Sequence, residues 1–162
     1  MFLFSRQGIN RCDVVSIRGK HFFGTSFRGC AFFKGDYTVK EKSVKRIVIG
    51  GCRTFTDYDV FKEYLDGFFL NLRQNHQIVI LSGHCRGVDA MAEKYAKENG
   101  FSLEIHPAEW EKYGRAAGPK RNEKMVLLAD CVIAFWDGKS RGTKSLISFA
   151  EDRQKPMQIK NI

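Results

Sequence analysis

Several signatures of familiar nucleotide enzymes and metalloproteins are missing from this sequence. It contains no Gly-x-x-x-x-Gly-Lys-Ser/Thr stretch, which excludes a P-loop nucleoside triphosphatase at the level of the motif. Gly-x-Gly-x-x-Gly is also absent, and this argues against a dinucleotide-dependent dehydrogenase. The five cysteines form no Cys-x-x-Cys pair, and the histidines show no metal-ligand spacing. We therefore predict no metal site and no cofactor.

Long apolar runs are missing as well. No stretch approaches the length of a membrane-spanning helix, and the opening Met1-Phe2-Leu3-Phe4 is too short for the apolar region of a signal peptide. The cysteine pattern gives no sign of a disulfide framework. These absences predict a cytoplasmic protein without a membrane partner.

The chain is basic, with a net charge of +9, but the charge is unevenly distributed. Residues 1–44 hold 8 Lys and Arg against 3 Asp and Glu, whereas residues 45–162 hold 19 against 15. In the second part the basic residues cluster in loops rather than along one helix face. This distribution favours a small anionic ligand over a polynucleotide, although a nucleic acid remains an alternative partner.

Composition divides the chain into a predicted N-terminal extension, residues 1–44, and a predicted domain, residues 45–162. The extension holds seven of the fourteen phenylalanines and has neither strand alternation nor a helical period. It is interpreted as a short β-hairpin packed on the domain edge, as an extension without evolved structure, or as a basic aromatic arm that stacks on bases.

From Lys45 onward, apolar runs alternate with helical patterns. The runs predict buried strands at 46–49, 77–81, 103–106, 131–135 and 156–159, and the patterns predict helices at 58–73, 88–98, 119–129 and 143–152. Thr56 or Asp57 is expected to cap the first helix, and Gly100 to end the second. The fold class is therefore α/β: a Rossmann-like three-layer sandwich with a mostly parallel sheet of about five strands.

Glycine-rich or basic loops follow the strands or precede the helices at four places, residues 50–57, 82–89, 114–122 and 137–143. In a parallel sheet such loops meet beyond the carboxyl ends of the strands, where ligands bind. Glycines allow close backbone approach, and helix N-termini favour anions such as phosphate. The predicted ligand-binding residues are Gly50, Gly51, Arg53, Ser82, Gly83, Arg86, Gly87, Asp89, Arg121, Asn122, Gly138, Ser140, Arg141, Gly142 and Thr143.

Two of these residues carry more specific expectations. Asp89 is expected either to cap its own helix or to accept a hydrogen bond from a ribose hydroxyl. Arg121 is placed on the first turn of a helix, where a cation opposes the helix dipole unless an anion binds there.

The motifs in these loops, taken in order, resemble the YspA-type SLOG family. The matching residues are Gly-Gly-x-Arg-x-Phe-x-Asp from Gly50, Gly-x-x-Arg-Gly-Val-Asp from Gly83, His106 to Trp110, Gly-Pro-x-Arg-Asn-x-x-Met from Gly118, and Ser140 to Thr143. The resemblance covers about residues 45–162. Because the family is similar to the Lonely Guy phosphoribohydrolases and to DNA-processing protein A, it implies a Rossmann-like sheet that binds a nucleotide or a nucleotide-derived ligand.

One departure bears on enzymatic activity. Lonely Guy enzymes carry a catalytic glutamate soon after Gly-Thr, whereas here Gly142-Thr143 is followed by Lys144 and the next acid is Glu151. The leading hypothesis is therefore a sensor or processing domain for a small nucleotide such as an ADP-ribose or NAD derivative. The alternatives are a nucleoside or nucleotide N-glycosidase and a single-stranded DNA-binding protein. Catalytic residues, the identity of the ligand and a homodimeric state are left open.

Overall fold

The computed structural model describes residues 16–17, 20–21 and 42–162, and the statements below concern those residues. The chain divides into Met1–Val39 and Lys40–Ile162, and each unit is described by itself. In the first, β1 (Ser16–Ile17) and β2 (Lys20–His21) pair antiparallel. The remainder of the predicted extension up to residue 41 lies outside the described residues. The three interpretations of that segment therefore stay predictions.

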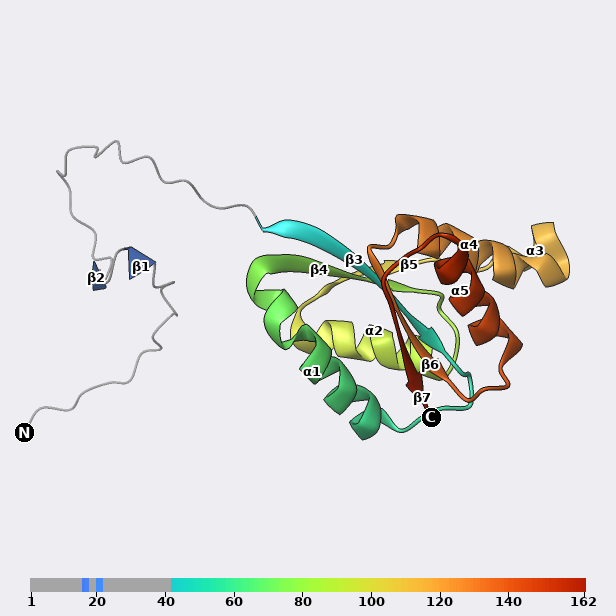
Figure 1. The fold of residues 1–162 in the computed structure, drawn as a ribbon, viewed down its shortest axis with the longest axis horizontal. Helices are drawn as coiled ribbons and strands as arrows, with labels where there is room; N and C mark the ends of the chain where they lie inside the picture. The colour runs from blue at the N-terminus through green and yellow to red at the C-terminus, as the bar shows by residue number, and fades with distance from the viewer. Residues whose placement is uncertain (1–15, 18–19, 22–41) are drawn as a thin grey trace, which may run out of the picture. The chain divides into compact units, whose positions relative to one another are not determined.

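The second unit is built on a parallel sheet of five strands in the order β5-β4-β3-β6-β7 (Figure 1). The strands are β3 (Ser43–Gly51), β4 (His76–Ser82), β5 (Ser102–Ile105), β6 (Cys131–Trp136) and β7 (Met157–Asn161). From β3 the chain first builds outward through β4 and β5, and then crosses back to add β6 and β7 on the other side. The strand order therefore reverses between β3 and β6, the point where parallel sheets bind ligands.

Helices cover both faces of the sheet, as Figure 1 shows. Helices α1 (Tyr58–Asn75) and α2 (Val88–Asn99) pack on one face, and α4 (Ala117–Leu128) and α5 (Arg141–Asp152) pack on the other. Successive residues of β3 serve the two faces in turn: Ile47 and Ile49 pack with α1 and α2, whereas Val48 packs with α4 and α5. The central strands are apolar on both sides because both of their faces are buried.

The two cores differ in the size of their side chains. The α1–α2 face contains Phe61, Phe69, Tyr95 and Phe135, each at most 1% exposed, whereas the α4–α5 face is filled by smaller residues such as Val126. Burying each large apolar side chain contributes about 1.5–3 kcal/mol to folding. The α/β fold class predicted from the sequence is confirmed.

The capping predictions are confirmed where the structure shows a hydrogen bond. Asp57 accepts from the Val60 amide at 3.1 Å at the start of α1. Gly100 ends α2 in the left-handed conformation, with φ 67°, and its N–H bonds back to the carbonyls of Ala96 and Lys97. Strand β3 begins at Ser43, two residues before the boundary proposed from composition.

The region between β5 and α4 differs from the prediction. The sequence predicts a loop there, but α3 (Trp110–Tyr113) and a 3-10 turn (Gly114–Ala116) occupy it, and α4 starts at Ala117 rather than at Pro119. Pro119 is the third residue of α4, where its missing N–H costs no helical hydrogen bond. Arg121 therefore lies on the second turn of α4, so the expectation that it lies on the first turn is wrong. None of the helices in the described part combines the length and apolar composition needed to cross a bilayer.

Candidate functional site

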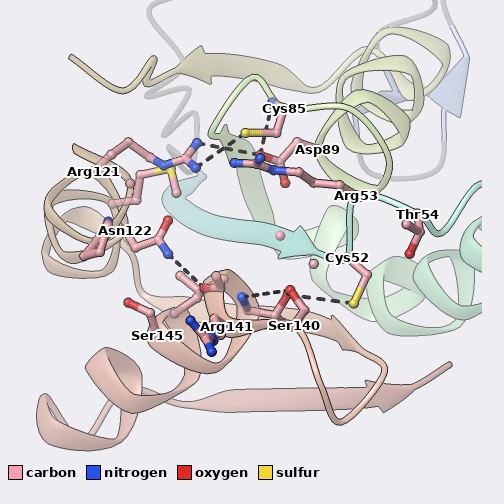
Figure 2. A pocket seen from close by; sticks show the side chains of 18 of the residues that line it. Cys52, Arg53, Thr54, Cys85, Asp89, Arg121, Asn122, Ser140, Arg141 and Ser145 are labelled. Carbon is pink, nitrogen blue, oxygen red and sulfur yellow. Dashed lines mark hydrogen bonds and ion pairs between the residues drawn. The ribbon is translucent and has the colours of Figure 1, made fainter. Parts of the chain in front are cut away.

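A cavity of about 510 Å³ opens at the carboxyl ends of β3 and β6, beside the loop that follows β4 (Figure 2). It lies at the point where the strand order reverses. Ten of the residues predicted from the sequence line it: Gly50, Gly51, Arg53, Asp89, Arg121, Asn122, Ser140, Arg141, Gly142 and Thr143. The structure thus brings together parts of the loops after β3, β4 and β6 with part of α4.

Five predicted residues do not line the cavity, namely Ser82, Gly83, Arg86, Gly87 and Gly138. Arg86 is exposed in the β4–α2 loop. The hydroxyl of Ser82 is buried and donates to Glu93 at 2.8 Å, so it holds β4 to α2. Each glycine of this set has a reason of its own, described below.

Arg121 is the central cation of the cavity. Its side chain is 10% exposed, and Nη1 lies 3.7 Å from the Asp89 carboxylate, too far for a hydrogen bond. Nη2 donates to the sulfur of Cys85 at 3.6 Å. The Nε and Nη1 atoms are buried and have no hydrogen-bond partner among the described residues. A buried guanidinium in this state is ready to bind an anion, because unpaired buried donors are costly.

Asp89 supports Arg121 from α2. Its side chain is 9% exposed and accepts a hydrogen bond from the Cys85 amide at 3.3 Å. Burial raises the pKa of Asp89, while the Arg121 guanidinium opposes that shift. The N-cap of α2 is Gly87, so Asp89 does not cap this helix. Its carboxylate instead binds the preceding loop and lies beside Arg121. Figure 2 shows Arg53 and Arg121 reaching toward Asp89 from opposite sides.

The glycines at the end of β3 and in the β4–α2 loop let these segments pack closely against each other, against β6 and against α4. Gly50 and Gly51 are the last two residues of β3, so the prediction that the loop begins at Gly50 is wrong. Gly87 has φ +79°, and a Cβ there would lie 2.5 Å from the Cys52 carbonyl oxygen. A Cβ at Gly83 would collide with the Arg121 guanidinium. A Cβ at Gly51 would collide with the Phe135 carbonyl. These positions need glycine because other parts of the protein lie against them.

The β6–α5 loop is organised by its own polar groups. The Asp137 carboxylate accepts from the amides of Ser140 at 2.7 Å and Lys139 at 2.9 Å, and these bonds lower the pKa of Asp137 to about 2. Ser140 caps α5 by accepting from the Thr143 amide, and its carbonyl accepts from the Trp136 indole N–H at 3.2 Å. The Thr143 hydroxyl donates to the Ser140 hydroxyl at 3.1 Å, so the two hydroxyls of these predicted ligand-binding residues bond to each other.

The cavity carries an excess of positive charge. Four arginines line it, Arg53, Arg115, Arg121 and Arg141, against the two carboxylates of Asp89 and Asp137. Arg53, Arg115 and Arg141 are exposed and form no ion pair with the residues that the structure describes. Asn122, buried on α4, donates to the Gly142 carbonyl at 3.1 Å and so ties α4 to the start of α5. The arginines together with the polar groups of the cavity suit a ligand that carries an anionic group beside a polar, hydrogen-bonding group.

Sequence reasoning missed part of the lining: Cys52, Thr54, Cys85, Trp110, Arg115, Gly118, Pro119, Met125, Asp137, Ser145 and Leu146. Most of these residues lie inside the glycine-rich loops or the motifs quoted for the family, so their position gave a signal. Met125 ends the motif quoted from Gly118, whereas Ser145 and Leu146 lie outside every motif, and no local pattern marks them as lining a cavity. Within the described residues, no cluster of His, Cys, Asp and Glu could hold a metal ion.

Comparison with known proteins identifies relatives of this chain. The model of the YspA, cpYpsA-related SLOG family matches residues 45–113. Gene 61 protein of Mycobacterium phage D29 is 32% identical over 118 residues, which cover 67% of this chain and 90% of that protein.

Solved structures share the fold at low identity. DNA processing protein A from Streptococcus pneumoniae is 18% identical with a TM-score of 0.56, over 73% of this chain and 50% of that one. The structural-genomics target TM1055 is 17% identical with a TM-score of 0.53, over 70% and 72%. DNA processing protein A from Helicobacter pylori is 23% identical with a TM-score of 0.50, over 72% and 65%. This chain thus spans half the length of the S. pneumoniae protein. On the phage relative and the family model, the chain belongs to the YspA, cpYpsA-related SLOG family.

Proposed function

We propose that the cavity binds a nucleotide or a nucleotide-derived small molecule, such as an ADP-ribose or NAD derivative, with a phosphate group against Arg121. The observation that carries this proposal is the buried guanidinium whose Nε and Nη1 atoms have no partner among the described residues. A volume of about 510 Å³ agrees with small-molecule sites, which span about 300–1,000 Å³. The excess of arginines supports an anionic ligand.

The experiment compares a nucleotide with its nucleoside. Calorimetry with AMP, ADP-ribose and adenosine is run on the wild type, on Arg121→Ala and on Arg86→Ala. A hydrogen bond to a charged group contributes about 1.5–3 kcal/mol, so Arg121→Ala should lower affinity for the phosphorylated ligands about ten- to a hundredfold. Adenosine should be much less affected. Arg86→Ala is the matched control because Arg86 is exposed in the adjacent loop and does not line the cavity. Equal losses for AMP and adenosine would contradict the proposal.

A second candidate function is cleavage of an N-glycosidic bond. It is favoured by one observation: Asp89 places a buried carboxyl, with a pKa raised by burial, in the same cavity as Arg121. Such chemistry usually needs a carboxylate to stabilise or attack the oxocarbenium ion. Nucleoside monophosphates are incubated with the protein, and free base is measured by chromatography. Base release that Asp89→Asn abolishes would establish the enzyme, and absence of release across the panel would exclude it for those substrates.

A third candidate is binding of single-stranded DNA, a ligand of the H. pylori DNA processing protein A. Here the proposal also involves residues 1–44, which we propose to be a separate segment from the domain of residues 45–162. Phosphate-backbone binding weakens steeply with salt. Salt-dependent binding of an oligonucleotide that is lost on deletion of residues 1–41, which leaves β3 intact, would support it. The free thiols of Cys52, Cys85 and Cys131 support a cytoplasmic location for any of the three functions.

A further inference from the structure

A second cavity lies on the other side of Arg121. Its volume is about 370 Å³, and it opens where β5 ends, between that strand, α3 and α4. His106, Tyr113, Lys120, Arg121 and Lys124 are among the residues that line it. Arg121 lines both cavities, so the two spaces are adjacent and share this side chain.

Both residues that carry unpaired buried polar atoms line this second cavity, and one of them, His106, lines this cavity and not the first. In the described part of the chain, the buried side-chain nitrogens and oxygens without a hydrogen-bond partner are His106 Nε2, Arg121 Nε and Arg121 Nη1. The Glu104 carboxylate is 3.8 Å from His106 Nε2, beyond hydrogen-bond distance. Because buried polar groups are nearly always paired, these atoms call for a partner supplied from outside the protein.

The charge of the cavity indicates the nature of that partner. Three cations line it, Lys120, Arg121 and Lys124, against one carboxylate, Glu109. Glu109 is exposed, and its carboxylate lies 3.7 Å from the ammonium of Lys112. The Lys120 ammonium lies 3.9 Å above the Tyr113 ring, a contact that leaves its N–H donors available.

We propose that this cavity is a second anion subsite, which holds a phosphate-type oxyanion between His106 Nε2, Arg121 and Lys124. The inference goes beyond the proposed function, since the subsite holds an anion whether or not a nucleotide occupies the first cavity. The anion is either free phosphate or a second phosphate of a ligand that extends past Arg121 from the first cavity. Both sources share the same chemistry: an oxygen acceptor for donors that are otherwise unpaired.

The electrostatics of His106 give the subsite a pH dependence. Burial lowers the pKa of His106; the Lys124 ammonium and, more weakly, Arg121 act in the same direction, while Glu104 opposes them. Glu109 and Lys120 also line the cavity that His106 faces. An anion bound beside the imidazole favours the protonated ring, so its binding raises the pKa of His106. By linkage, affinity for phosphate should increase as the pH falls through that pKa.

The test follows the histidine by NMR during titration with inorganic phosphate. The chain has four histidines, and loss of one imidazole signal in His106→Ala assigns it. In the wild type we expect a saturable shift of the His106 signal and a raised His106 pKa. Lys124→Gln should weaken phosphate binding about two- to fivefold, as for an exposed charge. Lys144→Gln removes another exposed lysine, on α5 and outside both cavities, and should have no effect.

Two further variants separate the cavities. Arg141→Gln removes a cation from the first cavity alone and should leave the phosphate-dependent His106 shift unchanged, whereas Arg121→Ala should abolish it. Tighter binding of ADP than AMP, lost in Lys124→Gln, would identify the second phosphate of one ligand as the occupant. Equal binding of ADP and AMP, with phosphate still saturating the His106 shift, would identify free phosphate. A His106 signal that does not respond to phosphate, or that responds equally in Lys124→Gln and the wild type, would overturn the subsite.

Discussion

The glycines at the end of β3 and before α2 differ from those before and within the first turn of α5, although all of them lie in glycine-rich segments at the same edge of the sheet. A Cβ added at Gly87 would lie 2.5 Å from a backbone oxygen of the neighbouring loop, and one at Gly50 would lie 2.9 Å from Leu146. A Cβ added at Gly138 or Gly142 would meet no atom within 4 Å. The first group is required by contacts inside the protein, and the second leaves open space.

This difference shows that glycines in similar sequence segments serve two purposes that the sequence does not distinguish. Some let other parts of the protein approach closely, and others leave open space. After β3 and β4 the glycines let backbone and Arg121 approach closely, and so they set the position of the cation. After β6, Gly138 supplies a left-handed turn with φ +75°, and Gly142 borders the cavity at a position where an added Cβ would meet no atom within 4 Å. Gly142 is therefore the better candidate for close approach of a ligand.

The largest effect is expected from Gly87→Ala. Gly87 has φ 79° and ψ −127°, a backbone conformation that costs an L-residue about 1–3 kcal/mol, and overpacking against the Cys52 carbonyl adds about 1–3 kcal/mol. Gly138→Ala is the matched control, because its φ of +75° is similar to the +79° of Gly87 and its surroundings are open. Urea unfolding should show a clearly greater loss of stability for Gly87→Ala. Equal losses of stability in the two variants would show that the close contact between Gly87 and the Cys52 carbonyl does not require glycine.

Gly83→Ala should cost less stability and still disable the anion site. The new Cβ would displace the guanidinium of Arg121 and crowd the Asp89 carboxylate at 2.8 Å; both are ends of side chains that can shift, so the fold should lose about 1 kcal/mol while the cation moves. Nucleotide affinity should fall about ten- to a hundredfold, as in Arg121→Ala. Calorimetry on Gly83→Ala/Arg121→Ala should then show little further loss. Additive losses of nucleotide affinity in the double variant would show that Gly83 does not act through the position of Arg121.

Asp89→Asn should change the pH dependence of stability. Burial raises the pKa of Asp89, so the favourable contribution of the carboxyl is present below its unfolded pKa of about 3.9 and is lost as the pH rises through the raised folded value. Asparagine does not titrate. The free energy of unfolding of Asp89→Asn relative to the wild type should therefore increase between pH 4 and pH 7, measured by urea unfolding. A difference independent of pH would show that the carboxyl is not perturbed.

The smallest change in stability is expected from Gly142→Ala. Alanine near the start of α5 is tolerated or stabilising by up to about 1 kcal/mol, and the added Cβ meets no atom. It would, however, enter the cavity, and calorimetry should show weaker nucleotide binding. Gly67→Ala in α1 is the control, since it is equally open and lies outside the cavity. Unchanged affinity in Gly142→Ala would place the ligand away from α5.

Most of the fold was predictable because its strands are buried on both faces. Runs such as 78–81 and 131–135 stand out from the polar segments around them, and Asp57 and Gly100 mark helix ends by well-understood backbone chemistry. α3 was not predictable, because four residues are too few to display a helical period. The early start of α4 was missed because Pro119 indicates a first helical residue and is equally acceptable later in the first turn.

The candidate site was predictable at the level of its loops and not at the level of its contacts. Parallel strands bring their carboxyl ends to one edge, so the convergence of the loops follows from the pattern. That Arg121 lies over Gly83 and lines two cavities depends on how α4 crosses the sheet, which no local sequence encodes. The contrast between Gly87 and Gly142 likewise depends on neighbours that are distant in the sequence.

The positions of the two tryptophans give the protein a built-in optical reporter. Trp110 is 52% exposed and lines the first cavity, while Trp136 ends β6 and is fixed through its indole N–H to the loop that borders the same cavity. The chain has no other tryptophan, so its indole emission originates entirely beside the candidate site. Ligand binding is therefore measurable by unlabelled fluorescence titration, and Trp110→Phe separates the solvent-exposed emitter from the anchored one.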